Sequence, residues 1–141
     1  MNDNDRALCA TTAGLIRASG AIAVWGLALA LIAGLVLALT GRSLPPTCWA
    51  AFAVVALAGL PERYAAFRLR HEAAIYEALC QGAIPTLAAL EASFKSLGLR
   101  RETDSSRPLA EHVRATRQLM QRHGFTVVMQ TIVFALGLAL E

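Results

Sequence analysis

The sequence has little charge and few aromatic residues, and its charges are missing from long stretches altogether. Only 16% of its 141 residues are charged and 56% are hydrophobic, whereas a typical soluble domain has about 25% charged residues. Aromatic residues make up 6% of the chain, so we expect its apolar contacts to form between smooth helices. Because the shortage of charge is concentrated in uninterrupted runs, it is typical of an integral membrane protein rather than a soluble domain.

Motifs that carry chemistry are also scarce. The three cysteines, Cys9, Cys48 and Cys80, are isolated, with no CxxC pair and no histidine at metal-ligand spacing. The sequence contains no P-loop, dinucleotide-binding fingerprint or nucleophile elbow. We therefore expect no disulfide, bound metal, cofactor or catalytic residue. The net charge of +3 is too modest to predict binding to nucleic acid.

Three hydrophobic runs predict an all-α membrane protein with three transmembrane helices, at residues 18–40, 47–61 and 124–141. The first run reaches about 34 Å at 1.5 Å per residue, enough to cross a hydrocarbon core of about 30 Å. It is longer than the apolar part of a signal peptide, so we interpret it as a retained span. The second run lies between Pro46 and Pro61. It is short enough to allow a re-entrant segment as the alternative to a full span.

The distribution of Lys and Arg predicts the orientation of these spans. Residues 62–123 hold ten of these residues, whereas the turn at 41–46 holds only Arg42 and the residues after 124 hold none. The positive-inside rule then places 62–123 and the N-terminal segment 1–17 in the cytoplasm, and the turn and C-terminus in the periplasm. This is a multi-pass arrangement in a bacterial-type inner membrane. It also favours a full second span, because otherwise the basic segment would have to be translocated.

Residues 62–123 are expected to be helical and to extend the second and third spans into the cytoplasm. An apolar stripe at helical spacing follows Pro61. Its members are Ala65, Leu69, Ala73, Tyr76 and Leu79. Residues 86–97 form a second amphipathic piece, with Gly98 placed as a C-cap, and residues 100–107 read as a polar loop. A further helix is expected from Pro108 through Met120 into the third span.

Two groups of residues are candidate contact sites. The first is a helix-packing interface, in which small residues and one amide would contact another helix, either of this chain or of a partner. Its members are Gly26, Ala30, Gly34, Ala38 and Gln130. The second group would attract anionic lipid headgroups at the membrane surface, at about 1 kcal/mol each. Its members are Arg63, Arg68, Arg70, Arg114, Arg117 and Arg122.

A metal site is the remaining chemical possibility. His71 and Glu72 would have to converge with Glu111 and His112 from the other predicted cytoplasmic helix. No Glu-x-x-His motif occurs, so we interpret these residues as surface charge. His123, at the start of the third run, is interpreted as an interfacial residue.

These observations favour a non-enzymatic accessory or scaffold subunit of an inner-membrane complex. It would pack through the first span, dock a partner through the cytoplasmic helices, and contact membrane lipids. The expected partners are other membrane-complex subunits or further copies of the chain. Two alternatives remain open, namely a homo-oligomeric, holin-like pore and a small metal- or lipid-dependent membrane enzyme.

Overall fold

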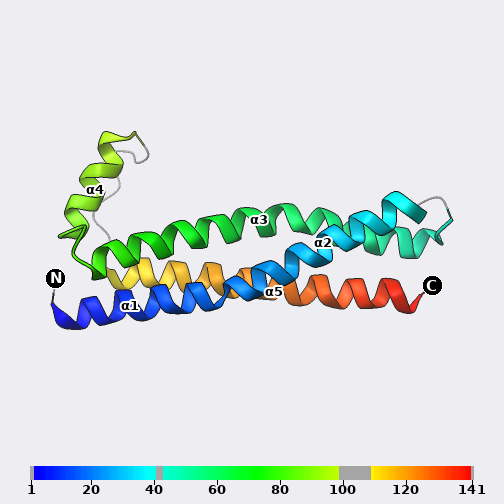
Figure 1. Ribbon diagram of the computed structural model, residues 1–141, viewed down its shortest axis with the longest axis horizontal. Helices are drawn as coiled ribbons and strands as arrows, with labels where there is room; N and C mark the ends of the chain where they lie inside the picture. The colour runs from blue at the N-terminus through cyan, green and yellow to red at the C-terminus, as the bar shows by residue number, and fades with distance from the viewer. Residues whose placement is uncertain (1, 41–42, 99–108, 141) are drawn as a thin grey trace. The chain divides into compact units, whose positions relative to one another are not determined.

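The computed structural model describes residues 2–40, 43–98 and 109–140. Within these ranges the chain is all-helical, with 89% of it in helices and no strands. The described helices are α1 (Asp3–Ala18), α2 (Gly20–Thr40), α3 (Pro46–Cys80), α4 (Leu87–Ser96) and α5 (Leu109–Ala139) (Figure 1). The predicted loop at 100–107, residues 41 and 42 of the predicted turn, and Glu141 lie outside the described residues.

Three helical segments are long and apolar enough to cross a membrane. They are Asp3–Thr40, which combines α1 and α2, and the single helices α3 and α5. The prediction of an all-helical chain with three such segments is therefore confirmed. Helix α3 continues without interruption past Pro61, and α5 begins at Leu109, ahead of the third hydrophobic run.

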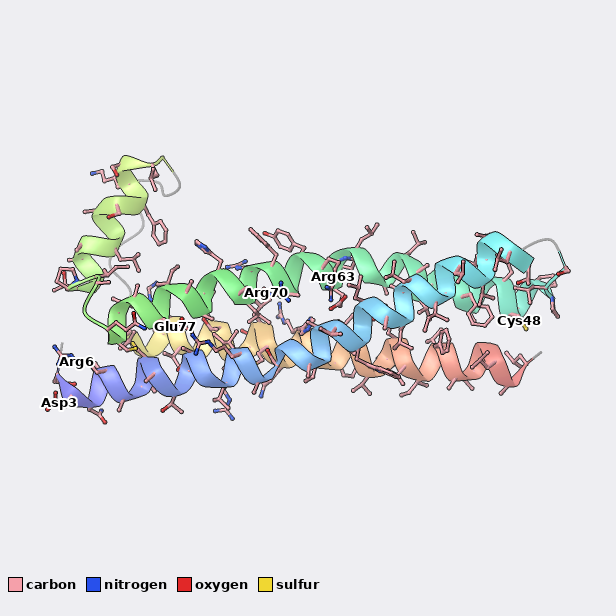
Figure 2. All side chains as sticks on the ribbon, viewed as in Figure 1. Asp3, Arg6, Cys48, Arg63, Arg70 and Glu77 are labelled. Atoms are coloured by element: carbon pink, nitrogen blue, oxygen red, sulfur yellow. The ribbon has the colours of Figure 1, made fainter. Side chains whose placement is uncertain are left out.

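The chain divides into two compact units. Unit 1 contains residues 1–17 and 69–118, and unit 2 contains residues 18–68 and 119–141. Helices α3 and α5 each contribute residues to both units. The side chains of unit 1 include many nitrogen and oxygen atoms, as at the labelled Asp3, Arg6, Arg70 and Glu77 (Figure 2). Between Cys48 and Arg63, by contrast, the side chains of α3 are almost entirely carbon.

Helix α1 is an element that the sequence analysis did not identify. Its first turn is closed by a reciprocal pair of hydrogen bonds, in which Asp5 N donates to Asn2 Oδ1 over 2.8 Å and Asn2 N donates to Asp5 Oδ2 over 3.3 Å. This is the geometry of a capping box. Its buried residues, Cys9, Thr12, Ala13 and Ile16, recur at three- and four-residue steps, so both signals were present in the sequence.

The ends of α4 follow the expected pattern. Thr86 is its N-cap, and the Thr86 hydroxyl accepts a hydrogen bond from Ala89 N over 3.2 Å. Gly98 follows the C-cap residue Leu97 and has a φ of +68°. This left-handed conformation is easy for glycine, which explains why the helix ends there.

Unit 2 packs α2, the first part of α3 and the last part of α5 against one another. Its apolar core contains Leu29 and Ala33 of α2 with Phe52 and Val55 of α3. The rings of Phe52 and Phe134 meet edge to face, with centroids 5.6 Å apart, an arrangement that aromatic pairs prefer. The core thus uses one aromatic pair and otherwise small or aliphatic side chains.

The exposed apolar surface of α3 is longer than the second hydrophobic run. Large exposed side chains recur along one side of the helix from Trp49 through Leu57 and Leu60 to Tyr64 and Phe67. Trp49 and Phe67 are separated by about 27 Å at 1.5 Å per residue, close to the thickness of a hydrocarbon core. Aromatic residues stand at both ends, as in the belts at membrane interfaces. The apolar face therefore reaches six residues beyond Pro61, where the predicted span ended.

Close contact between α2 and α3 depends on Gly59. A Cβ atom placed on Gly59 would lie only 2.6 Å from the Cβ of Ala30. We expect Gly59→Ala to lower the free energy of unfolding by about 1–3 kcal/mol, because the helices must move apart. The measurement is reversible unfolding in mixed micelles. Gly124→Ala is the control, since a Cβ there meets nothing within 4 Å; equal losses in the two variants would contradict the packing account.

Candidate functional site

Unit 2 buries a cluster of charged side chains between its apolar helices. The Glu62 side chain is 0% exposed and the His123 side chain 1% exposed, while Arg63 is 34% exposed. Glu62 and Arg63 lie on α3, directly after Pro61, and His123 lies on α5. Ionisable groups are costly in such surroundings unless they are paired, so their contacts define the candidate site.

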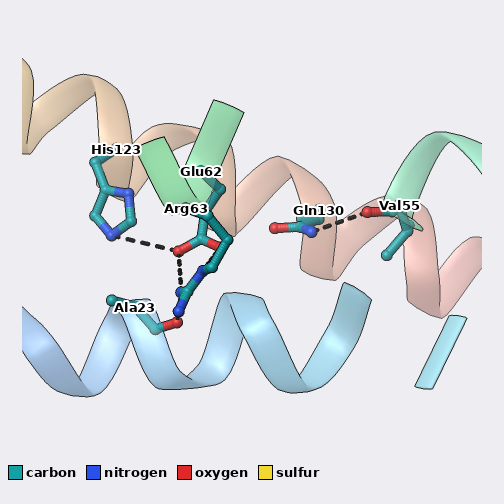
Figure 3. A network of polar contacts seen from close by, with 6 residues as sticks. All are labelled: Ala23, Val55, Glu62, Arg63, His123 and Gln130. Atoms are coloured by element: carbon teal, nitrogen blue, oxygen red, sulfur yellow. Dashed lines mark hydrogen bonds and ion pairs between the residues drawn. The ribbon is translucent and has the colours of Figure 1, made fainter. Parts of the chain in front are cut away.

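Arg63 neutralises Glu62 and also contacts α2. Arg63 Nε donates to Glu62 Oε2 over 3.0 Å, and Arg63 Nη2 donates to Glu62 Oε1 over 2.7 Å. The same Nη2 donates to the backbone carbonyl of Ala23 on α2 (Figure 3). Both carboxylate oxygens are thus engaged by one guanidinium, which is the strong, two-pronged form of this interaction. The pair also joins α3 to α2.

His123 approaches the same carboxylate from α5. Its Nε2 lies 3.8 Å from Glu62 Oε1 (Figure 3), which is too long for a hydrogen bond. Neither Nδ1 nor Nε2 of His123 has a hydrogen-bond partner, although both atoms are buried. Buried polar atoms of this kind are rare, because each one loses its contacts with water without replacement.

Gly26 of α2 provides the space for the Glu62 carboxylate. A Cβ atom on Gly26 would lie 3.0 Å from Glu62 Cδ, 3.2 Å from Glu62 Oε1 and 3.0 Å from Val127 Cγ2. Any larger residue would press on the charged group and on α5 together. Gly26 therefore contacts the charged cluster, in addition to serving as a small residue in helix packing.

The other small residues of the predicted helix-packing interface do not all contact another helix of this chain. Ala30 faces Gly59 inside the unit, whereas a Cβ on Gly34 would meet nothing within 4 Å, and Ala38 is exposed. Packing inside the chain thus uses the Gly26 end of the predicted stripe and leaves its Gly34–Ala38 end uncovered.

Gln130, seven residues after His123, joins α5 to α3. Its Nε2 donates to the Val55 carbonyl over 3.0 Å, while its Oε1 has no partner. A second link joins α5 to α2, because Trp25 Nε1 donates to Thr131 Oγ1 over 3.1 Å. The interhelical hydrogen bond that was predicted for Gln130 is therefore present within the chain.

The polar residues of α5 recur at seven-residue intervals on its buried face. Thr116, His123 and Gln130 are all buried, and each meets a group on α3. In unit 1, the hydroxyls of Thr116 and Tyr76 are 3.0 Å apart, and the contacts of the other two in unit 2 are described above. A seven-residue period is typical of long helices that pack along a common seam, so this spacing sets which residues of α3 and α5 meet.

The buried face of α3 has the same period. From Cys48 to Tyr76 its buried residues follow alternating four- and three-residue steps, and one more buried residue, Leu79, follows three residues later. The residues in the alternating run are Cys48, Phe52, Val55, Gly59, Glu62, Ala66, Leu69, Ala73 and Tyr76. Glu62 therefore occupies a position at which this spacing predicts a buried residue. Glu62 is the first residue of the region 62–123 that was expected to lie in the cytoplasm, although this period was available to identify it as buried.

The predicted basic residues fall into two groups. Arg68, Arg70, Arg114, Arg117 and Arg122 are all exposed. Arg63 differs from them, because its guanidinium is directed to Glu62 and to α2.

The four residues considered as a metal site do not form one. In the described ranges, no group of three or more His, Cys, Asp or Glu side chains is placed to hold a metal ion. His71 and Glu111 are exposed. Unit 1 instead contains an ion pair between Arg17 and Glu77.

Comparison of the chain with protein-family models, curated proteins and solved structures finds no match. The class of the protein therefore rests on the fold itself. Over the described residues it is all-helical, and its three long apolar helices are those of a candidate multi-pass membrane protein.

Removing the Glu62 carboxylate tests the cluster energetically. We expect Glu62→Leu to lower the free energy of unfolding in micelles by about 3–5 kcal/mol, because Arg63 is then left without its counter-charge. Glu62→Gln should cost less, since the amide still accepts a hydrogen bond. The matched control is Glu77→Gln, which breaks a more exposed Arg–Glu pair and should cost about 1 kcal/mol or less. A loss in Glu62→Leu no larger than in this control would refute the assignment.

Proposed function

We propose that this protein is a non-enzymatic accessory or scaffold subunit of an inner-membrane complex. Its three apolar helices would anchor it, and the helical region at 62–123 would dock a partner. The observation that carries the proposal is the uncovered apolar side of α4.

Helix α4 is amphipathic, yet none of its described side chains is buried. Leu90 and Phe94 are only half-buried, and Leu97, at its C-cap, is 69% exposed. By contrast, the apolar residues Cys9 and Ile16 of α1, in the same unit, are buried. A helix of ten residues gains most of its stability from packing of its apolar face. A protein partner that covers Leu90, Phe94 and Leu97 would supply that packing.

The distribution of ionisable groups supports an anchoring role over transport. Residues 18–40, 43–61 and 124–140 contain no charged residue and no histidine. The charged cluster lies at one end of these runs, since His123 directly precedes the third and Glu62 directly follows the second. A proton or ion pathway through one copy would need further polar groups along the membrane. The runs offer small and aliphatic residues instead, which suit helix packing.

Two features suggest where partners would bind. The excess of Lys and Arg in 62–123 supports a cytoplasmic location for this region under the positive-inside rule, where α4 would meet a soluble protein or a cytoplasmic domain. Within the membrane, Gly34 and Ala38 of α2 form a small-residue surface that internal packing leaves uncovered. A helix of a neighbouring subunit could approach closely there.

Photocrosslinking from α4 in intact cells tests the docking proposal. A photoreactive amino acid at Phe94 samples the apolar side, and the same probe at the exposed Ala92 is the matched control. We expect the Phe94 probe to capture one defined protein that the Ala92 probe does not. Capture of another copy of this chain would show that α4 serves self-association and would contradict docking of a different protein at this helix. Equal capture from both positions, or capture of lipid alone, would contradict the proposal.

A further inference from the structure

The unsatisfied imidazole of His123 is the feature that an anchoring role leaves unexplained. Its side chain is 1% exposed, both ring nitrogens lack hydrogen-bond partners, and one of them faces Glu62. The charged groups around it are Glu62 and Arg63 from α3, whereas α2 contributes no charged side chain, because Gly20–Thr40 has none. On α5 itself the neighbouring Arg122 is exposed.

We infer that His123 and Glu62 together form a proton-binding site that determines how the Glu62 carboxylate is shared between α3 and α5. The site is independent of the scaffold function. A neutral imidazole has one donor and one acceptor, whereas the imidazolium has two donors. With a proton on Nε2, His123 can donate to Glu62 Oε1 after a shift of about 1 Å, which gives the length of a charge-assisted hydrogen bond.

The two cations would then compete for one oxygen atom. Glu62 Oε1 lies 3.8 Å from His123 Nε2, and the same oxygen accepts the hydrogen bond from Arg63 Nη2. That same Nη2 reaches the Ala23 carbonyl on α2. Proton uptake by His123 therefore strengthens the link from α3 to α5 and weakens the hold of Arg63 on Glu62. Through Arg63, the change is transmitted to α2.

Titration of the histidines by nuclear magnetic resonance tests the site. The chain has three histidines, so ¹⁵N-labelled imidazoles can be assigned from His71→Gln, His112→Gln and His123→Gln variants of the full chain in nanodiscs. We expect the His123 signal to titrate reversibly. Glu62→Gln should lower the pH of its midpoint by about one unit or more, because the attractive carboxylate is lost, and Arg63→Gln should raise it, because a repulsive cation is removed.

The opposite directions separate a proton site from a merely structural contact. Circular dichroism of each variant checks that its helices are intact, and Arg63→Lys serves where Arg63→Gln fails to fold, with an expected midpoint close to that of the unsubstituted protein. His71→Gln and His112→Gln should leave the His123 midpoint unchanged. A His123 signal that stays in one protonation state while the helices remain folded would overturn the inference. Shifts in the same direction for Glu62→Gln and Arg63→Gln would also overturn it.

Trp25 reports on α2 during the same titration. It lies two residues after Ala23, and its indole N–H donates a hydrogen bond to the Thr131 hydroxyl. In a Trp49→Phe background it is the only tryptophan. We expect its emission to change with the same pH midpoint as His123, and we expect His123→Gln, but not His112→Gln, to abolish the change. Constant emission while His123 titrates would overturn the transmission to α2.

Discussion

A carboxylate that leaves water must keep partners that replace its hydration. The Glu62 side chain is wholly buried among apolar helices, and groups from several helices provide these partners. Arg63 occupies both carboxylate oxygens, Gly26 leaves the volume that the carboxylate fills, and His123 faces it from α5. Since each helix of unit 2 contributes to the surroundings of one carboxylate, displacing any of them exposes a charge to hydrocarbon. The cluster thus specifies which faces of α2, α3 and α5 meet, a specification that small apolar residues provide only weakly.

The seven-residue period of α3 and α5 explains how this charge is accommodated without disrupting the packing. Along α5, a polar side chain occupies every second layer of the buried face, at Thr116, His123 and Gln130. Polar residues in an otherwise apolar seam fix its register, because a shift would leave them unpaired. Small residues at Gly26 and Gly59 then let α2 approach closely. Apolar contacts make up most of the interface between these helices, and the polar layers determine the register in which the helices pack.

Much of the architecture could be predicted from the sequence because it depends on local features. Uncharged runs predicted three long apolar helices, Pro108 and Thr86 predicted helix starts, and Gly98 predicted a helix end. The cluster was missed because Glu62 and Arg63 directly follow Pro61. Arg63 was interpreted as a basic residue at the membrane surface, and Glu62 as part of the cytoplasmic helical region 62–123. Their charge was taken as a stronger signal than the spacing of buried residues, although Glu62 continues the spacing of Phe52 and Val55. The contact of His123 with Glu62 depends on the pairing of helices distant in sequence, which composition does not encode.

The central claim is that Glu62 and His123 act together across the α3–α5 seam, and a double-mutant cycle measures this directly. The unfolding free energies of Glu62→Gln, His123→Gln and the double variant are compared with that of the unsubstituted protein in the same micelles. Contacting residues give interaction energies of about 0.5–3 kcal/mol, whereas independent sites add to within about 0.5 kcal/mol. The account predicts an interaction energy in the first range that grows as the pH is lowered and His123 takes up its proton. Additivity of the two substitutions at every pH would contradict it.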